Sequence, residues 1–304
     1  MILVAGLSPA WQQIIQFSRL NLGEVNRADS VCWCASGKVL NVGIALRHLI
    51  PEGKSEFMPH VLSAGGVWSG QSIQQELSHH NLAFDWIDDP TPTRVCTTVL
   101  DAEQNLTTEL VENSAALAAS TIQQFVERFQ RLAAQAEFVV LAGSLPAGLP
   151  DSFYAELLQH VSVPVLLDFR GPALHQCLPH RPFVVKPNRE ELASTVGYAI
   201  ENDDALTRAM QEVADAGAQH VVVSDGPQRL FALSPGGMQS FVPPQAAKVV
   251  NPIGCGDCLA AGIALGLTLS KSIEESIQIG LQAAKDNVEQ LLPARCHPIA
   301  WPDA

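Results

Sequence analysis

The residues best suited to chemistry lie in a glycine-containing segment, Asn251-Pro-Ile-Gly254-Cys255-Gly256-Asp257-Cys258, which precedes an apolar stretch. Glycines ahead of a helix let the backbone approach a ligand and offer its N–H groups, and the helix dipole favours negative charge there. Asp257, in the first turn of the predicted helix, is placed to accept a proton beside a bound anion. The alternative is an ordinary turn in which Asp257 only stabilises the helix N-terminus.

A second candidate segment reads Phe183-Val-Val-Lys186-Pro187-Asn188-Arg-Glu-Glu191. The apolar run predicts a strand that ends at Lys186, and Asn188 can cap a helix that begins with Arg-Glu-Glu. One interpretation is a plain strand-to-helix turn. The other places Lys186, Asn188 and Glu191 at the carboxyl end of a sheet strand, where a Mg²⁺–nucleotide could bind.

The seven cysteines do not suggest disulfides, because their number is odd and the chain is long enough to fold without them. Cys255 and Cys258 have the spacing of half a zinc site or of a redox pair, and Cys32 and Cys34 could in principle meet them. We favour small buried thiols and expect no zinc. Reduced thiols predict a cytoplasmic protein.

Composition excludes several classes of function. The chain has 304 residues, 47% of them hydrophobic, and a formal net charge of −13. The apolar content is enough for a full core, whereas the acidic balance argues against nucleic-acid binding, which needs Lys and Arg for the phosphates. No apolar run approaches the ~20 residues that span a bilayer, so no membrane partner is expected.

Elements that would position these residues alternate along the chain. Apolar runs that predict strands cover residues 2–7, 59–64, 137–142, 163–168, 182–186 and 219–224. Helical spacing covers residues 39–49, 69–80, 118–134, 150–160 and 203–216, and two more helices are predicted within 256–291. This alternation predicts a doubly wound α/β fold with a mainly parallel sheet flanked by helices. Extended segments without helices, at about 11–34 and 94–112, predict a small β-lid over the ligand.

Together the motifs resemble the ribokinase-like sugar kinases. Lys186-Pro-Asn-x-x-Glu191 followed by the Gly-x-Gly-Asp helix start is similar to that family, and the N-terminal half narrows the resemblance to one branch. Its further motifs here are Leu7-Ser-Pro-Ala10, Gly23-Glu-Val-Asn-Arg27, Ser36-Gly-Lys-Val-Leu-Asn41, Thr93-Arg94 and Gly143-Ser-Leu-Pro-Ala-Gly-Leu-Pro150. The branch contains 1-phosphofructokinases, minor 6-phosphofructokinases and tagatose-6-phosphate kinases. The resemblance runs from residue 1 to about 290.

The resemblance implies one kinase domain over residues 1–304, with ATP and Mg²⁺ as cofactors and a β-lid that often forms a homodimer interface. It implies that Asp257 is the catalytic base and that Gly254, Cys255 and Gly256 form an anion hole. The implied nucleotide and Mg²⁺ residues are Lys186, Asn188, Glu191, Ser224, Gly226 and Asn287, with Mg²⁺ held by Asn188 and Glu191 largely through water and nucleotide. The implied sugar-phosphate residues are Gln12, Arg27, Gly37, Lys38, Asn41, Arg94 and Ser144.

Several positions depart from the branch's pattern. Gln12 stands where a sugar-binding Asp is usual, Val39 where a glycine is usual, and Pro252 where a threonine is usual; Lys285 and Asp286 interrupt a small apolar stretch. We expect Val39 to narrow the sugar floor. The leading prediction is an ATP-dependent kinase of fructose 1-phosphate, fructose 6-phosphate or tagatose 6-phosphate. The alternatives are a catalytically weak sugar-phosphate- or nucleotide-binding pseudokinase, and a kinase of an unphosphorylated sugar or a nucleoside.

Overall fold

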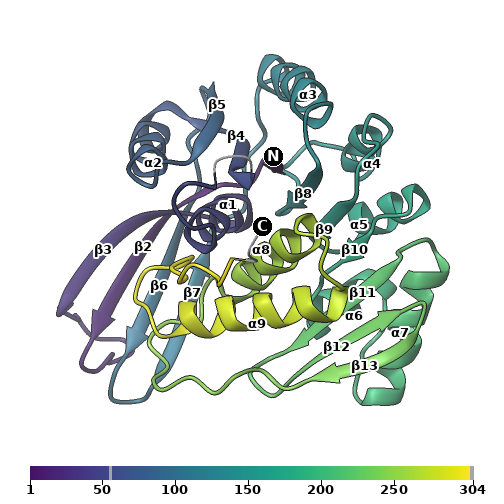
Figure 1. Cartoon of the computed structure of the whole chain (residues 1–304). Helices are drawn as coiled ribbons and strands as arrows, with labels where there is room; N and C mark the ends of the chain where they lie inside the picture. The colour runs from purple at the N-terminus through teal and green to yellow at the C-terminus, as the bar shows by residue number, and fades with distance from the viewer. Residues whose placement is uncertain (55–56, 302–304) are drawn as a thin grey trace.

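A nine-stranded sheet forms the centre of the computed structural model, which describes residues 1–54 and 57–301 (Figure 1). Its strand order is β13-β12-β11-β10-β9-β8-β1-β4-β5. The strands are β1 (Ile2–Ala5), β4 (Pro59–Gly66), β5 (Ala83–Asp89), β8 (Phe138–Ala142), β9 (Val165–Asp168), β10 (Val184–Val185), β11 (His220–Asp225), β12 (Arg229–Ser234) and β13 (Gly237–Phe241). All neighbours from β5 to β11 pair in parallel, and β12 and β13 are antiparallel.

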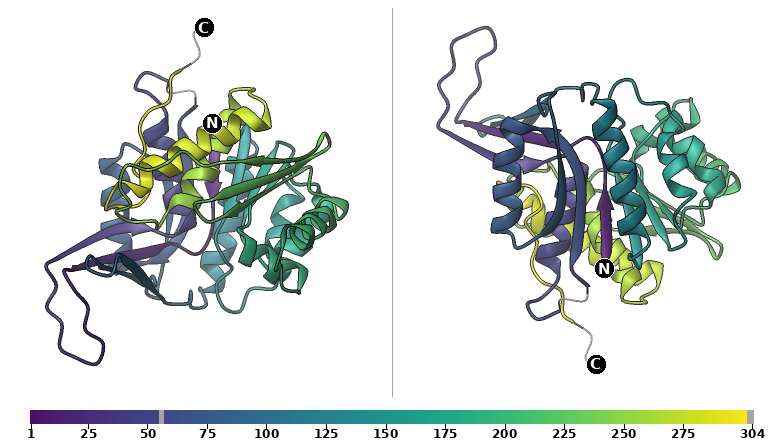
Figure 2. Two further views of the ribbon diagram at one scale, coloured as in Figure 1. Left: turned by 90° about the horizontal axis from the view of Figure 1, so that it is seen from below. Right: turned by 90° about the horizontal axis from the view of Figure 1, so that it is seen from above.

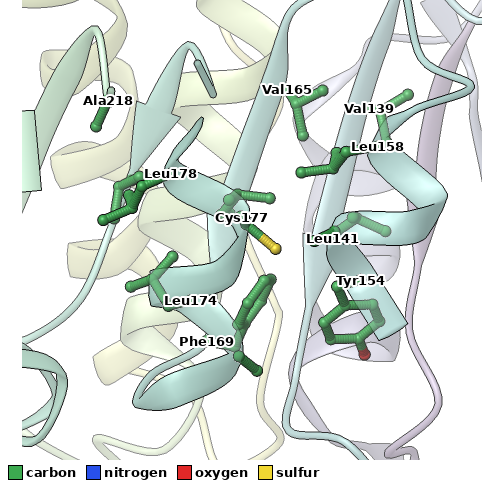
Figure 3. Packing of buried hydrophobic residues seen from close by; sticks show 14 of the residues in the cluster. Val139, Leu141, Tyr154, Leu158, Val165, Phe169, Leu174, Cys177, Leu178 and Ala218 are labelled. Atoms are coloured by element: carbon green, nitrogen blue, oxygen red, sulfur yellow. The ribbon is translucent and has the colours of Figure 1, made fainter. Parts of the chain in front are cut away.

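Helices cover both faces of this sheet because successive strand residues point to opposite sides. In β1, Leu3 and Ala5 pack into one core layer, and Ile2 and Val4 pack into the other. The first layer holds α3 (Ala119–Ala133), α4 (Phe153–Leu158), α5 (Pro172–Cys177), α6 (Arg189–Val196) and α7 (Asp203–Asp215). The second holds α1 (Lys38–Leu49), α2 (Val67–His79), α8 (Cys255–Thr268) and α9 (Ile273–Val288). Figure 3 shows part of the first layer, where Tyr154 and Phe169 meet at 4.7 Å between ring centroids.

The lid is a separate four-stranded sheet of order β3-β2-β6-β7. Its strands are β2 (Ala10–Phe17), β3 (Ser30–Ser36), β6 (Val95–Asp101) and β7 (Leu106–Val111). One face, with Ile14 and Cys34, packs against Leu291 and Leu292 of the main body. The loop between β2 and β3 projects away from the molecule (Figure 2).

The fold class expected from the sequence is confirmed, and so are the lid strands and the helices at the two candidate segments. The sequence did not predict β5, β12 or β13, whose residues lack a long apolar run. Val39 was expected to narrow the floor of a sugar pocket, but its side chain is fully buried within α1 and packs in the second core layer. Within residues 1–54 and 57–301, no helix is both long and apolar enough to cross a membrane.

Candidate active site

The start of α8 is shaped by Gly254, the N-cap residue. Its φ of 88° is a left-handed conformation that suits glycine. A Cβ there would lie 2.9 Å from the Pro293 side chain, so the close approach also requires glycine. The Cys255 N–H makes only a long 3.3 Å bond to the Pro252 carbonyl. Across the described residues, the exposed Gly256 has no acceptor for its N–H, which leaves a donor at the positive end of the helix.

Asp257 follows in the first turn and is 7% exposed. Asn41, on α1, donates its amide N–H to Asp257 Oδ2 at 2.6 Å, which fixes the carboxylate. Burial, reinforced by the negative charge of Asp168, raises the pKa of Asp257 to about 7. A carboxylate with a pKa near neutrality is suited to accept a proton in catalysis.

A buried charge cluster lies beside this acid. Lys38 Nζ is 2.7 Å from Asp168 Oδ1 and 2.8 Å from Glu191 Oε1. Lys186 Nζ is 3.2 Å from Asp168 Oδ2. This contact is an ion pair, but its angles do not meet those of a hydrogen bond. Burial opposes ionisation of Asp168, yet the two lysines hold its pKa below the ordinary value. The result is two ammonium groups fixed close to the Asp257 carboxylate.

Lys38 and Lys186 reach this cluster from different elements. Lys38 is the first residue of α1, directly after the Gly37 turn that joins the lid to the body. Lys186 follows β10 and is 3% exposed. A Cβ on Gly256 would lie 3.6 Å from Lys186 Nζ, so this ammonium is next to the free N–H of the α8 turn. Both groups can therefore stabilise one anion.

Asn188 and Glu191 form a capping box at the start of α6. Asn188 Oδ1 accepts the Glu191 N–H at 2.7 Å, and Glu191 Oε2 accepts the Asn188 N–H at 3.0 Å. Asn188 also makes a parallel β-bridge with Ser224, at the end of β11. Gly226, the first residue after β11 in the turn to β12, has a φ of 61°. Four of the predicted nucleotide residues thus lie together at the carboxyl edge of the sheet.

Asn287 has a different place from the one predicted. It is fully buried. Its Nδ2 donates to the Ile253 carbonyl at 2.9 Å, and its Oδ1 accepts the Ala294 N–H at 2.6 Å. Because both ends of the amide are occupied, Asn287 supports the Gly254 loop instead of presenting its side chain to a ligand.

On the lid side, Gln12 is buried and donates to Thr98 Oγ1 at 2.7 Å, a bond between two neighbouring lid strands. Gly37 is needed for its φ of 89° and for space, because a Cβ would lie 2.7 Å from the Ser8 carbonyl. Asn41 has one free group, since its Oδ1 is buried and lacks a hydrogen-bond partner among the described residues.

Arg94 uses three of its five N–H donors on backbone carbonyls, those of Ser8, Pro9 and Glu112, at 3.1–3.3 Å. Arg94 forms no ion pair with Asp88 or Asp89, two carboxylates that precede it closely in the described part of the chain. Its two remaining donors and its partial exposure leave it able to bind an anion.

Ser144 follows β8, and its hydroxyl is 3.3 Å from that of Ser8. Ser8 in turn lies 2.8 Å from the hydroxyl of Ser114. The Ser8 carbonyl also accepts a hydrogen bond from Arg94. The hydroxyls of Ser8, Ser114 and Ser144 therefore lie close to the Arg94 guanidinium.

Arg27 is not brought to this site. It is exposed in the loop between β2 and β3 that projects from the body, as Figure 2 shows. The other predicted sugar residues lie on or beside β2, β6, β8 and α1.

Sequence reasoning missed three residues: Asp168, Ser8 and Ser114. Asp168 carried a usable signal, because it is a carboxylate ending an apolar strand run, at the edge of the sheet where ligands bind. Ser8 lies in the Leu7–Ala10 motif, but its contact with Ser114 had no local signal, since the two residues are 106 positions apart.

The fold is an α/β sandwich with a lid sheet, and the candidate site lies at the carboxyl edge of its main sheet. A family model described as pfkB family carbohydrate kinase matches residues 8–300, so the chain belongs to that family, whose members are ATP-dependent kinases.

Solved structures of similar fold include phosphofructokinase-2 from Escherichia coli in complex with fructose-6-phosphate, with 24% identity over 96% of this chain and 95% of that one and a TM-score of 0.83. A possible 1-phosphofructokinase from Thermotoga maritima has 20% identity over 98% and 94%, with a TM-score of 0.86. Ribokinase from Arabidopsis thaliana, complexed with ribose and ATP, has 19% identity over 97% and 95%, with a TM-score of 0.72. At these identities the likeness shows the fold.

Proposed function

We propose that this protein transfers the γ-phosphoryl group of ATP to a hydroxyl of a phosphorylated ketohexose: fructose 1-phosphate, fructose 6-phosphate or tagatose 6-phosphate. The observation that carries the proposal is Asp257, a buried acid with a pKa of about 7, set beside the free N–H of Gly256 and two lysines. Phosphoryl transfer needs positioning and charge stabilisation, and this arrangement supplies both.

In the proposed reaction Asp257 accepts the proton of the attacking hydroxyl. The hydrogen bond from Asn41 holds the Asp257 carboxylate in place. The N–H of Gly256 and the ammonium of Lys186 stabilise the charge that develops on the transferring group. The dipole of α8 adds to this stabilisation at its N-terminus.

The side-chain oxygens of Asn188 and Glu191 suit Mg²⁺, because this ion prefers carboxylate and amide oxygens and keeps several waters. Glu191 already accepts Lys38 at Oε1 and the Asn188 N–H at Oε2. We therefore infer that Asn188 and Glu191 would hold the ion largely through water and nucleotide. When bound, the ion neutralises charge on the phosphates.

A coupled assay of ADP release across a panel of acceptors tests the proposal. Turnover with one of the three sugar phosphates at least ~10-fold faster than with fructose, ribose or adenosine would support it. A faster rate with an unphosphorylated acceptor would assign a different substrate class. No ADP release with any acceptor, despite binding of a sugar phosphate or of ATP, would support a pseudokinase.

Arg94 should read the phosphate already on the sugar, because its two free donors suit phosphate oxygens. Arg94→Ala should lower kcat/KM for the sugar phosphate by about 1.5–3 kcal/mol, mainly through KM, and change the KM for ATP little. Arg128→Ala is a matched control, because Arg128 also donates to a carbonyl, that of Trp86, but on α3. An equal fall in kcat/KM for the sugar phosphate and for ATP would indicate that Arg94 only holds the Ser8–Pro9 turn.

We also propose that the chain forms a homodimer through the outer face of the lid. Val31, Trp33 and Leu110 share that face by strand register and are 49%, 43% and 59% exposed. Apolar exposure of this kind marks interaction surfaces.

Trp33→Glu should convert the dimer to monomers, as measured by sedimentation at micromolar concentration. Trp68→Glu, which changes an exposed residue of α2, should leave the dimer intact. A wild-type protein that sediments as a monomer would contradict the proposal. Arg27, on the projecting loop, could then reach the site of the second copy.

A further inference from the structure

A single carboxylate, that of Glu76, joins the lid to the body of the protein. Glu76 lies on α2, with its side chain 18% exposed. Its Oε2 accepts the Ala35 N–H at 2.6 Å, and its Oε1 accepts an N–H of the Arg295 guanidinium at 3.1 Å. Ala35 belongs to β3 and Arg295 to the segment after α9, so Glu76 holds together two segments that are far apart in the sequence.

The bond to Ala35 covers an edge of the lid. β3 is an edge strand of the lid sheet, in which Ala35 pairs with Trp11 of β2. Ala35 is 2% exposed, and a buried N–H without a partner is costly. Glu76 supplies the acceptor that the edge of the sheet lacks. β3 ends one residue before the Gly37 turn, so the position of this strand also sets the start of α1 and its lysine, Lys38.

The bond to Arg295 reaches the catalytic turn. Arg295 also donates to the Pro293 carbonyl at 3.3 Å. The Pro293 side chain would lie 2.9 Å from a Cβ on Gly254, so it packs directly on the turn before α8. Between them, the Ala294 N–H donates at 2.6 Å to Asn287, the residue that supports the Gly254 loop. The backbone beside Arg295 is therefore fixed to this turn.

The same segment touches the lid through apolar side chains. Leu291 and Leu292 pack against the lid residues Ile14 and Cys34. Apolar contacts are non-directional, so they hold the two surfaces together without fixing how one is placed on the other. The hydrogen bonds of Glu76 have preferred angles and can fix this placement.

Glu76 makes these bonds as a carboxylate. Burial opposes its ionisation, yet the neighbouring His80, the Ala35 N–H and Arg295 hold the pKa of its carboxyl below the ordinary value. Hydrogen bonds to an ionised acceptor are about twice as strong as those between neutral groups. His80 in turn lies 3.1 Å from His48, so the cluster also contacts α1.

We propose that Glu76 is a positioning residue that holds the lid in register with the catalytic turn of α8. This role rests on the proposed function, in which the lid positions the acceptor and the α8 turn positions the transferring phosphoryl group. A misplacement of about 1 Å can cost ~100-fold in rate. Loosening the connection should therefore slow the reaction, although Glu76 touches no reacting atom.

Glu76→Gln tests the role, because the amide keeps one acceptor oxygen but loses the charge and the second acceptor. It should lower kcat/KM for the preferred sugar phosphate by ~10-fold or more, in part through a raised KM for that acceptor. The KM for ATP should change little, because the proposed nucleotide residues lie at β10, α6 and β11. A variant that is only less folded would lose kcat and keep both KM values.

Asp85→Asn is the matched control. Asp85, on β5, is 26% exposed and lies 3.0 Å from Arg131 and 3.7 Å from His60, so it also joins an arginine and a histidine. It should keep both KM values. Arg295→Met should reproduce the effect of Glu76→Gln, Arg295→Lys should retain most of the activity, and combining Glu76→Gln with Arg295→Met should add no further loss.

Hydrogen exchange followed by mass spectrometry tests the positioning without turnover. Peptides covering residues 30–37 and 291–297 should exchange faster in Glu76→Gln than in the wild type, and at the wild-type rate in Asp85→Asn. Unchanged exchange in both peptides would overturn the inference, as would additive losses in the double variant or a fall in kcat with both KM values kept. If the wild type showed no kinase activity, the proposed function would fail, but the exchange rates would still decide whether Glu76 holds the two segments.

Discussion

Asp257→Asn should lower turnover by ~10²–10⁴-fold while ATP binding stays nearly unchanged, because the amide has the same shape but cannot take the hydroxyl proton. Asn41 can still donate to the side-chain oxygen at residue 257, so the turn should keep its geometry. The measurements are steady-state ADP release with the preferred acceptor and calorimetric titration with ATP.

Asp286→Asn is the matched control, because Asp286 is also a buried carboxylate, 4% exposed, but lies on α9 and pairs with His297. It should leave turnover within a few-fold of the wild type. If Asp257→Asn also retained activity within a few-fold, Asp257 would not be the base and the proposed mechanism would be wrong.

The raised pKa of Asp257 gives a readout that needs no substrate. The folded protein holds this proton up to about pH 7, whereas an unfolded Asp releases it near 3.8. The contribution of Asp257 to stability is thus present below 3.8 and lost as pH rises through 7. Asp257→Asn should therefore gain stability relative to the wild type between pH 4 and pH 8 in denaturant titrations. A constant difference across this range would show that the pKa is not raised.

Asp168→Asn should lower the free energy of unfolding by about 3–5 kcal/mol, the usual effect of removing one partner of a buried ion pair. The fully buried carboxylate neutralises Lys38 and Lys186, and the variant leaves these two ammonium groups close together without it. Urea denaturation followed by fluorescence measures the loss. The same variant should weaken nucleotide binding, because both lysines would lose their position.

Asp203→Asn serves as the comparison. Asp203 also bridges two cations, Arg189 and Arg229, but its side chain is 55% exposed. Exposed pairs contribute ~0–1 kcal/mol, so this variant should be close to the wild type. A loss below ~1 kcal/mol for Asp168→Asn as well would mean that water or rearrangement compensates the two lysines, and that the cluster is not a structural requirement.

The sequence was sufficient for the features that depend on neighbouring residues. The Asn188 cap, the Gly254 turn before α8 and the apolar runs of β8 and β11 all follow from local rules of capping, glycine conformation and periodicity. These rules operate over a few residues, so one sequence contains the whole signal. The order of these elements was enough to predict the α/β class and the lid strands.

Only the tertiary structure decided which side chains meet. Lys38 contacts Asp168 from 130 residues away, and Asn41 contacts Asp257 from 216 residues away. It also decided that Arg94 uses three donors on backbone carbonyls. Such contacts depend on how strands line up and how helices pack, and no local pattern records them. The sequence by itself determined the class of chemistry and the turns that carry it, whereas packing determined the charge partners and hence the pKa of the acid.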